Sequence, residues 1–268
     1  MKNGTSKNVQ DKVTIVTGAS SGIGRETALL FAAHGAKVVA AARSREKLLS
    51  LKKEIEAAGG YCSIVPTDVA RQDEVERLIQ QTHQAFGRID ILINNAGQGL
   101  FKFLSDTSIE DFRKIMEVNF YGAVFAVKAA LPIFLQQKSG LIVNVASVAG
   151  KRSFERMSAY CASKFALIGF TEVLHYELID KGIRAVAICP PAIDTPFFDN
   201  AGYHNFRETH KGLPMLSPKE VAQEIFASTR RKKREVIISR RAKIINAIHA
   251  LSPELMEGIT KVLTGKRA

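Results

Sequence analysis

Short apolar runs alternate with longer helical patterns along most of the chain, and this alternation constrains the fold more than any other feature. The runs lack the strict polar alternation of a half-buried strand, which is typical of strands buried on both faces. Parallel strands joined by helices bury strands in this way. The expected strands are Val13–Val16, Lys37–Ala41, Tyr61–Val65, Ile89–Ile93, Leu141–Val145, Ile183–Ile188 and Glu235–Ser239.

Helix signals fill the intervals between these runs. Ser44 is placed to cap the helix that follows it, and Ser217 with Glu220 predicts a capping box. We therefore predict an α/β fold, a single doubly wound (Rossmann-type) seven-stranded parallel sheet flanked by helices. It forms one domain over 1–268, in which 240–268 is a basic amphipathic C-terminal extension. The expected helices are Ile23–His34, Arg45–Ala58, Arg71–Phe86, Ser108–Gln136, Ser158–Lys181 and Pro218–Arg230.

Composition narrows the class of protein. The formal net charge is +12, and residues 211–268 carry 13 Lys or Arg against 5 Asp or Glu. The segment Met1–Lys12 is polar, without the apolar core of a secretory signal, and no stretch approaches the roughly 18 uncharged apolar residues of a membrane span. The three cysteines are an odd number without a CxxC pair, and the histidines show no metal-ligand spacing. We expect a cytoplasmic protein with no metal site.

The first chemical motif is the glycine-rich segment Thr17–Gly24, TGASSGIG, between the first expected strand and the first expected helix. Glycines let the backbone turn tightly and approach a pyrophosphate, and the helix N-terminus offers unpaired N–H groups. A glycine-rich turn in this context predicts a phosphate site.

Several ordered motifs resemble the classical short-chain dehydrogenase/reductase family over about Lys12–Phe198. They are TGxxxGxG at 17–24, Asn94-Asn95-Ala96-Gly97 after the fourth strand, Asn119, Ser147, and Tyr160 with Lys164 as a YxxxK pair. The resemblance implies hydride transfer between a nicotinamide cofactor and a carbonyl or hydroxyl group. It names Asn119, Ser147, Tyr160 and Lys164 as the catalytic set. The implied cofactor-binding residues are Gly18, Ser20, Ser21, Gly22, Ile23, Gly24, Arg43, Asp68, Val69, Asn95, Ala96, Gly97, Tyr160, Lys164, Ile193 and Thr195.

The catalytic set also makes chemical sense from its residues. Tyr160 and Lys164 are four apart in an expected helix and lie on one face. A nearby ammonium would lower the pKa of the phenol toward the working range, so that Tyr160 could give a proton to the substrate oxygen. Ser147, at the end of a strand, could hold that oxygen. The resemblance further implies that Lys164 contacts the nicotinamide ribose and that Asn119 holds a water in the proton relay.

The end of the second strand bears on the choice of cofactor. An acidic side chain there would bind the ribose 2′-OH and repel a 2′-phosphate. This chain has Ala42 followed by Arg43, whose planar guanidinium suits a phosphate. We expect NADP(H) to be preferred over NAD(H), although Arg43 could instead be a solvated residue ahead of a helix.

One position departs from the family pattern. After the sixth strand the family usually has Pro-Gly, whereas this chain has Pro190-Pro191, as do some branches including 3-ketosphinganine reductases. Proline fixes φ and lacks an N–H, so the local loop geometry is expected to differ.

Aromatic residues point to the substrate class. Phe197, Phe198, Tyr203 and Phe206 fall in the expected lid, and Phe101 follows the fourth strand. We expect a hydrophobic small-molecule carbonyl substrate, a ketone, aldehyde or 3-oxo-acyl compound. One alternative is a membrane-surface lipid reductase similar to 3-ketosphinganine reductases. A second is a non-catalytic NADP-binding regulator with Arg230–Arg234 as a basic patch.

Partners follow from the helices and the tail. The resemblance implies a homodimer or homotetramer, paired through the helices over Ser108–Gln136 and Ser158–Lys181. The basic run has no interleaved aromatics, so no nucleic-acid partner is expected. The tail from Arg240 onward either contacts a membrane peripherally or packs on protein. Its apolar stripe is Leu255, Met256, Ile259, Val262 and Leu263.

Overall fold

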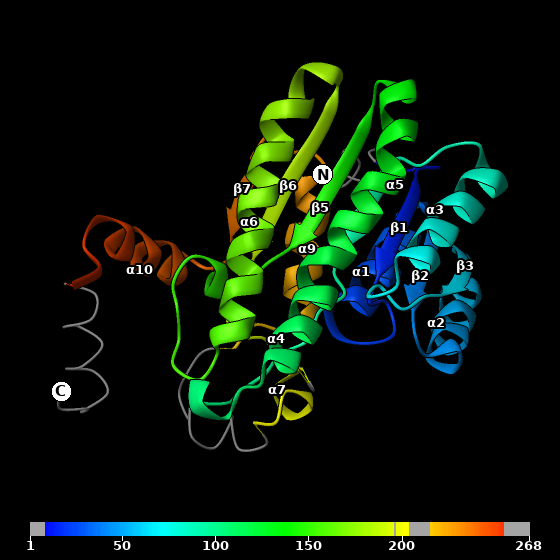
Figure 1. The fold of residues 1–268 in the computed structure, drawn as a ribbon. Helices are drawn as coiled ribbons and strands as arrows, with labels where there is room; N and C mark the ends of the chain where they lie inside the picture. The colour runs from blue at the N-terminus through cyan, green and yellow to red at the C-terminus, as the bar shows by residue number, and fades with distance from the viewer. Residues whose placement is uncertain (1–8, 196, 204–214, 255–268) are drawn as a thin grey trace.

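A seven-stranded parallel sheet runs through the centre of the computed structural model, which describes residues 9–195, 197–203 and 215–254 (Figure 1). The strand order is β3-β2-β1-β4-β5-β6-β7. This confirms the predicted doubly wound fold. The strands are β1 (Val13–Thr17), β2 (Lys37–Ala42), β3 (Tyr61–Pro66), β4 (Ile91–Asn94), β5 (Gly140–Val145), β6 (Ile183–Cys189) and β7 (Glu235–Ile237).

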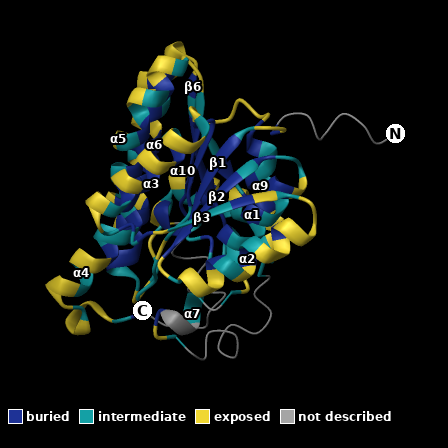
Figure 2. Cartoon of the chain, turned by 90° about the vertical axis from the view of Figure 1, so that its right-hand side faces the viewer, coloured by how far each residue is buried: buried dark blue, intermediate teal, exposed yellow. Residues whose placement is uncertain are grey.

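Helices cover both faces of the sheet, as Figure 2 shows by the dark-blue strands inside and the yellow outer helix surfaces. One face holds α1 (Gly22–Ala33), α2 (Arg45–Ala57) and α9 (Pro218–Ser228). The other holds α3 (Gln72–Phe86), α5 (Gly122–Gln137) and α6 (Ser158–Leu178). Neighbouring strand residues alternate between the two cores: Val16 and Ile93 face the first group, and Ile15 and Leu92 face the second. Burial on both sides explains why the strand runs are mostly apolar and lack strict polar alternation.

The strand order reverses between β1 and β4, since the chain leaves β1 toward β2 and later returns to pair β4 with β1. In parallel α/β sheets the carboxyl ends of the strands on either side of such a switch point enclose a crevice that holds ligands. The glycine-rich loop follows β1, and the NNAG segment follows β4. The topology therefore brings both motifs to the same crevice.

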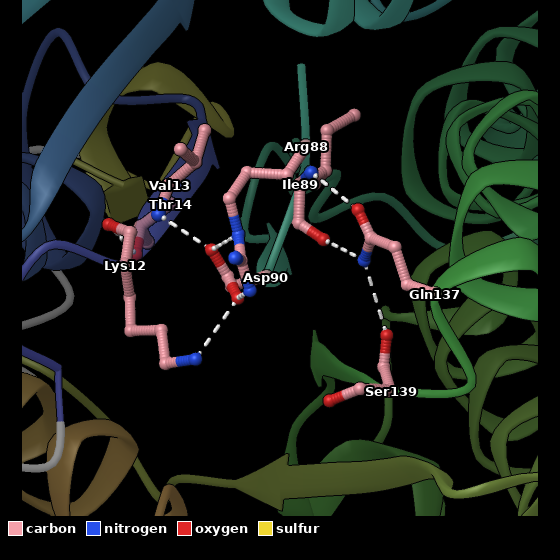
Figure 3. Close-up of polar contacts among 8 residues, drawn as sticks. All are labelled: Lys12, Val13, Thr14, Arg88, Ile89, Asp90, Gln137 and Ser139. Atoms are coloured by element: carbon pink, nitrogen blue, oxygen red, sulfur yellow. Dashed lines mark hydrogen bonds and ion pairs between the residues drawn. The ribbon is translucent and has the colours of Figure 1, made fainter. Parts of the chain in front are cut away.

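At the amino ends of β1 and β4, away from the crevice, one carboxylate connects neighbouring segments, as Figure 3 shows. Asp90 is 6% exposed and accepts hydrogen bonds from the backbone N of Val13 (2.9 Å), from Arg88 (2.6 and 2.9 Å) and from Lys12 Nζ (3.1 Å). Burial opposes ionisation, but these donors hold the pKa of the Asp90 carboxyl below its usual value. The contacts join the start of β1 to the segment before β4.

Most expected elements are confirmed, including the caps at Ser44 and Ser217. The expected strand over Ile89–Ile93 begins instead at Ile91 and ends at Asn94. The single helix expected over Ser108–Gln136 is divided into α4 (Ile109–Met116), a π-helical turn Glu117–Tyr121 and α5. The strand expected to reach Ser239 ends at Ile237, and Ser239, with φ +81°, caps the next helix.

By length and mean hydropathy alone the stretch Ile109–Gln137 could cross a bilayer, although Lys128 interrupts its apolar run. Its buried residues Ala126, Ala130 and Phe134 pack on strand residues such as Leu92 and Ile142. Packing of this kind is typical of a helix that covers the sheet of a globular domain.

The last described helix, α10 (Arg240–Leu251), stands out from the body of the molecule at the left of Figure 1. On this helix the polar side chain of Asn246 is buried, with 6% exposed, while two apolar side chains face solvent: Ile244 is 61% and Leu251 88% exposed. The apolar stripe predicted from Leu255 to Leu263 lies outside the described residues.

Candidate active site

Ser147, Tyr160 and Lys164 meet at the carboxyl end of β5. Ser147 follows that strand by two residues, and α6 delivers Tyr160 and Lys164 from its first two turns. Tyr160 and Lys164 are 7% and 4% exposed, Ser147 forms a hydrogen bond with Tyr160, and Lys164 Nζ lies 5.7 Å from the Tyr160 ring centroid. The structure therefore brings three of the four predicted catalytic side chains together in a buried place.

The electrostatics differ from the expectation that Lys164 lowers the pKa of Tyr160. Burial raises the pKa of Tyr160 to about 12, against a lowering effect of the Ser147 hydrogen bond. Burial also lowers the pKa of Lys164 to about 8. The Lys164 ammonium donates to the backbone O of Val145 at 3.0 Å. Burial is thus the largest influence on the pKa of both groups in this structure.

Asn119, the fourth predicted residue, lies in the π-helical turn and is 1% exposed. Its Oδ1 accepts from Gln98 N (2.7 Å), and its Nδ2 donates to Gln98 O (2.9 Å) and to Ser163 Oγ (3.0 Å). The side chain therefore joins the loop after β4 to α6. Since its amide is committed to these partners, the implied water relay stays a prediction and would need another atom of Asn119.

The glycine-rich loop is fastened to the NNAG segment. Gly18 has φ +67°, and a Cβ there would lie 2.8 Å from Ala96 Cα, so the close approach requires glycine. Thr17 Oγ1 accepts from the backbone N of Asn95 (3.0 Å) and of Ala96 (3.1 Å), and Asn95 Nδ2 donates to Thr17 O (3.0 Å). The predicted residues Asn95 and Ala96 thus hold the loop in place through Thr17.

The remaining predicted cofactor residues border the same crevice, and the geometry fits a dinucleotide. A Cβ on Gly97 would lie 3.5 Å from Lys164 Nζ, and one on Gly22 would lie 3.3 Å from Thr195 Cγ2. These distances place the loops after β1, β4 and β6 around one space beside Lys164. Ser21 begins α1 without using its side chain as a cap, and Ser20 precedes it. The start of this helix therefore faces the crevice, where a pyrophosphate is favoured.

Arg43, Asp68 and Val69 follow the neighbouring strands β2 and β3, whose ends are joined where Thr67 N donates to Ala42 O at 3.0 Å. Arg43 is exposed, and no described carboxylate pairs with it. Val69 packs against Gly122 of α5. Gly24, Ile23 and Ile193 face inward, since Gly24 and Ile193 are buried and Ile23 packs on the core.

The loop after β6 carries the Pro190-Pro191 departure. Pro190 O accepts from Val148 N at 3.0 Å, which ties the loop to the segment after Ser147. All peptide bonds in the described residues are trans. The Pro-Pro pair is therefore compatible with a loop that stays next to Ser147.

Aromatic side chains lie against Tyr160, the predicted proton donor. Phe197 lies 5.5 Å from Tyr160 between ring centroids, and Phe101 lies 5.6 Å from Phe198 and 5.2 Å from Tyr203. These contacts make an apolar wall beside the reacting position. Phe206, also predicted for the lid, lies outside the described residues.

Sequence reasoning missed a buried polar chain behind the site. Asn94 Nδ2 donates to Asn144 Oδ1 (2.8 Å), and Asn144 Nδ2 donates to Thr171 Oγ1 (2.8 Å). This series of hydrogen bonds joins β4, β5 and α6, and α6 carries the predicted catalytic residues Tyr160 and Lys164. An asparagine inside an apolar strand was the signal that could have found it, because buried amides require hydrogen-bond partners.

Comparisons with known proteins agree with this geometry. The family described as short chain dehydrogenase matches residues 12–205. An uncharacterized oxidoreductase of Bacillus subtilis, YxnA, is 35% identical over 94% of this chain and 72% of its own. A fatty acyl-CoA reductase of Acinetobacter baylyi is 35% identical over 93% of this chain and 83% of its own.

Solved structures show the same likeness. A short chain dehydrogenase/reductase from Burkholderia phymatum in complex with NAD has a TM-score of 0.83 at 29% identity, over 92% of this chain and 96% of that one. A metagenomic short-chain oxidoreductase in complex with NADP has a TM-score of 0.75 at 28% identity, over 87% of this chain and 98% of that one. The chain therefore belongs to the short-chain dehydrogenase family and is an oxidoreductase.

Proposed function

We propose that this protein reduces the carbonyl group of a hydrophobic small molecule with NADPH, or runs the same reaction in reverse. The observation that carries the proposal is the buried group of Ser147, Tyr160 and Lys164 at the crevice where the glycine-rich loop and Gly97 also meet. The cofactor, when bound, supplies or accepts the hydride. The protein must then hold the substrate oxygen and move one proton.

Each residue has a distinct part in this proposal. The hydroxyl of Ser147 holds the substrate oxygen, and the phenol of Tyr160 gives that oxygen its proton during reduction. Lys164 contacts the cofactor ribose and, as a cation, favours the tyrosinate left behind. Asn119 positions α6 through Ser163. Phe101, Phe197 and Phe198 exclude water from the reacting group.

NADP(H) is the proposed cofactor in preference to NAD(H). Arg43 stands exposed at the end of β2 beside Ala42, and no acidic residue takes the position that would bind the 2′-OH. A guanidinium at this position can bind a 2′-phosphate through two parallel hydrogen bonds. Among the similar structures one contains NAD and another NADP, so their cofactors do not decide between the two.

The proposed substrate is a ketone, an aldehyde or a 3-oxo-acyl compound. The aromatic wall beside Tyr160 favours an apolar chain, and a relative of similar length is named a fatty acyl-CoA reductase. A membrane-surface reductase of lipid ketones is the second candidate, favoured by the exposed Ile244 and Leu251 on α10. A non-catalytic regulator fits less well. The basic run proposed for a regulator, Arg230–Arg234, precedes β7. It therefore lies at the amino ends of the strands, whereas the crevice lies at their carboxyl ends.

Partners and location complete the proposal. We propose one domain over 1–268 that assembles through the outer faces of α5 and α6, which expose Leu135 and Val173. We further propose a cytoplasmic protein that contacts anionic membrane through α10. On that helix Arg240, Arg241 and Lys243 lie beside exposed apolar residues, a combination that binds membrane interfaces.

A carbonyl panel followed by NADPH absorbance tests the reaction class. The panel should contain 2-alkanones, n-aldehydes and 3-oxo-acyl thioesters, each at several chain lengths, with a sugar and a small 2-oxo acid as controls. We expect kcat/KM to rise with chain length in at least one series. Turnover of only the sugar or the small acid would contradict the proposed substrate class.

A further inference from the structure

A cavity of about 510 Å³ opens beside the N-terminal end of α6. Its apolar lining comes from three segments: Leu104 after β4, Phe154 in the loop before α6, and Cys161, Ala162 and Phe165 on the helix itself. Ligand pockets of proteins commonly have volumes of roughly 300–1,000 Å³ and mostly apolar walls. The cavity is therefore large enough for a hydrocarbon chain.

This cavity is distinct from the reacting position. Ala162 and Phe165 lie on a neighbouring face of α6 from Tyr160 and Lys164, and neither Ser147 nor Tyr160 lines the cavity. A molecule bound there would contact α6, the helix that carries Tyr160 and Lys164, but would not contact those two residues.

The cationic side chains around the cavity differ in whether a carboxylate is paired with them. Lys102 lines it but is paired with Asp111 at 3.0 Å. Arg156 also lines it, and its guanidinium stacks on Phe103 at 5.0 Å. Arg152 stacks at 4.5 Å on the ring of Phe154, and burial lowers its pKa. Neither arginine forms an ion pair with a carboxylate in the described part of the chain. Arg152 is half-buried and Arg156 is exposed, so an anion at the cavity could reach two guanidinium groups that no described carboxylate neutralises.

The backbone at Arg156 supports this view. Its φ is +66°, a left-handed conformation that disfavours a long side chain, and its O accepts from Lys102 N at 2.9 Å. That hydrogen bond joins two of the three segments around the cavity. Residues held in such conformations cluster at ligand sites, where the surrounding structure maintains them. The fold therefore keeps an arginine where glycine would be less strained.

We propose that this cavity binds a single-chain amphiphile with an anionic head, a carboxylate or a phosphate. The chain lies against Phe154, Ala162 and Phe165, and the head contacts the guanidinium groups of Arg156 and Arg152. Planar guanidinium groups match both anions through paired hydrogen bonds. The site does not depend on the proposed reduction, because none of its residues takes part in that chemistry.

Isothermal titration of the assembled, cofactor-free protein tests the site directly. The probes are decanoate, decyl phosphate and uncharged 1-decanol, each kept below the concentration at which it aggregates. We expect saturable binding of at least one anion and binding of decanol at least tenfold weaker. The two anionic probes distinguish a carboxylate site from a phosphate site.

Two variants and a matched control locate the binding. Arg156→Gly removes the guanidinium at a position whose backbone suits glycine, and should weaken anion binding roughly ten- to a hundredfold. Ala162→Phe fills the cavity from the helix and should abolish binding of every probe. Lys138→Gly removes an exposed cation that also has a positive φ (+50°), at the far end of α5, and should leave binding unchanged.

Failure of both anions to bind would overturn the proposal, as would equal binding by wild type, Arg156→Gly and Ala162→Phe. Circular dichroism confirms that each variant is folded. Because no turnover enters the measurement, its failure leaves the proposed carbonyl reduction untouched, and loss of reduction would leave this site untouched.

Discussion

Replacing Lys164 by methionine removes a charge that the fold holds away from water. Lys164 is 4% exposed, and burial lowers its pKa from 10.5 to about 8. At 1.36 kcal/mol per pKa unit, the folded state loses roughly 3 kcal/mol by keeping this group charged. Methionine has a similar length but leaves Val145 O without its hydrogen bond, a loss of about 1 kcal/mol. The variant should therefore be about 2 kcal/mol more stable than wild type at neutral pH.

The pH dependence gives the sharper test. Below the folded pKa of about 8, Lys164 is charged in both states and its full penalty is present. Between about 8 and 10.5 the unfolded state binds more protons than the folded one, so wild type gains stability relative to the variant as pH rises. The advantage of Lys164→Met should thus shrink to near zero at about pH 9.5.

Urea unfolding of the cofactor-free protein at both pH values measures this difference. Carbonyl turnover by the same variant should be lost, because Lys164 has a proposed part in the reaction. The reasoning would be refuted if Lys164→Met were less stable than wild type at neutral pH, or if the difference did not change with pH.

Three further predictions concern the cofactor, the tail and the assembly. Arg43→Ala should raise KM for NADPH roughly ten- to a hundredfold, through loss of a charge-assisted hydrogen bond, with little change for NADH; an equal loss for both cofactors would exclude a 2′-phosphate contact. Wild type should sediment with anionic liposomes at low salt, and a variant with Ile244→Asp and Leu251→Asp should not; wild type left in the supernatant would contradict the membrane proposal. Light scattering at micromolar concentration should give a dimer or tetramer, and a Leu135→Glu, Val173→Glu variant should give a smaller species; a wild-type monomer would refute the assembly.

The fold could be predicted because local and global signals agree. The strand runs are mostly apolar, and caps such as Ser44 and Ser217 begin the helices where the pattern requires them. The ordered motifs then place the glycine-rich loop, Ser147 and Tyr160 on elements whose relative positions the parallel topology determines. That is why the residues of the candidate site could be predicted from the sequence.

What could not be predicted depends on contacts between distant segments. The π-helical turn at Asn119 has no local sequence signal, since it forms where Asn119 meets Gln98 and Ser163. The direction of the pKa shift at Tyr160 was wrong because spacing along a helix says nothing of how deeply the phenol is buried. The cavity beside α6 likewise arises only where three separate segments meet.

The central claim is that Tyr160 gives the proton to the substrate oxygen, and Tyr160→Phe tests it most directly. General acid catalysis contributes roughly a hundred- to ten-thousandfold, so kcat for carbonyl reduction should fall by at least that lower factor. The Kd for NADPH, measured by quenching or enhancement of the cofactor's fluorescence, should stay within about twofold of wild type. Tyr176→Phe, at an exposed tyrosine on the same helix, is the matched control and should behave as wild type. A Tyr160→Phe enzyme that kept wild-type kcat would contradict the account.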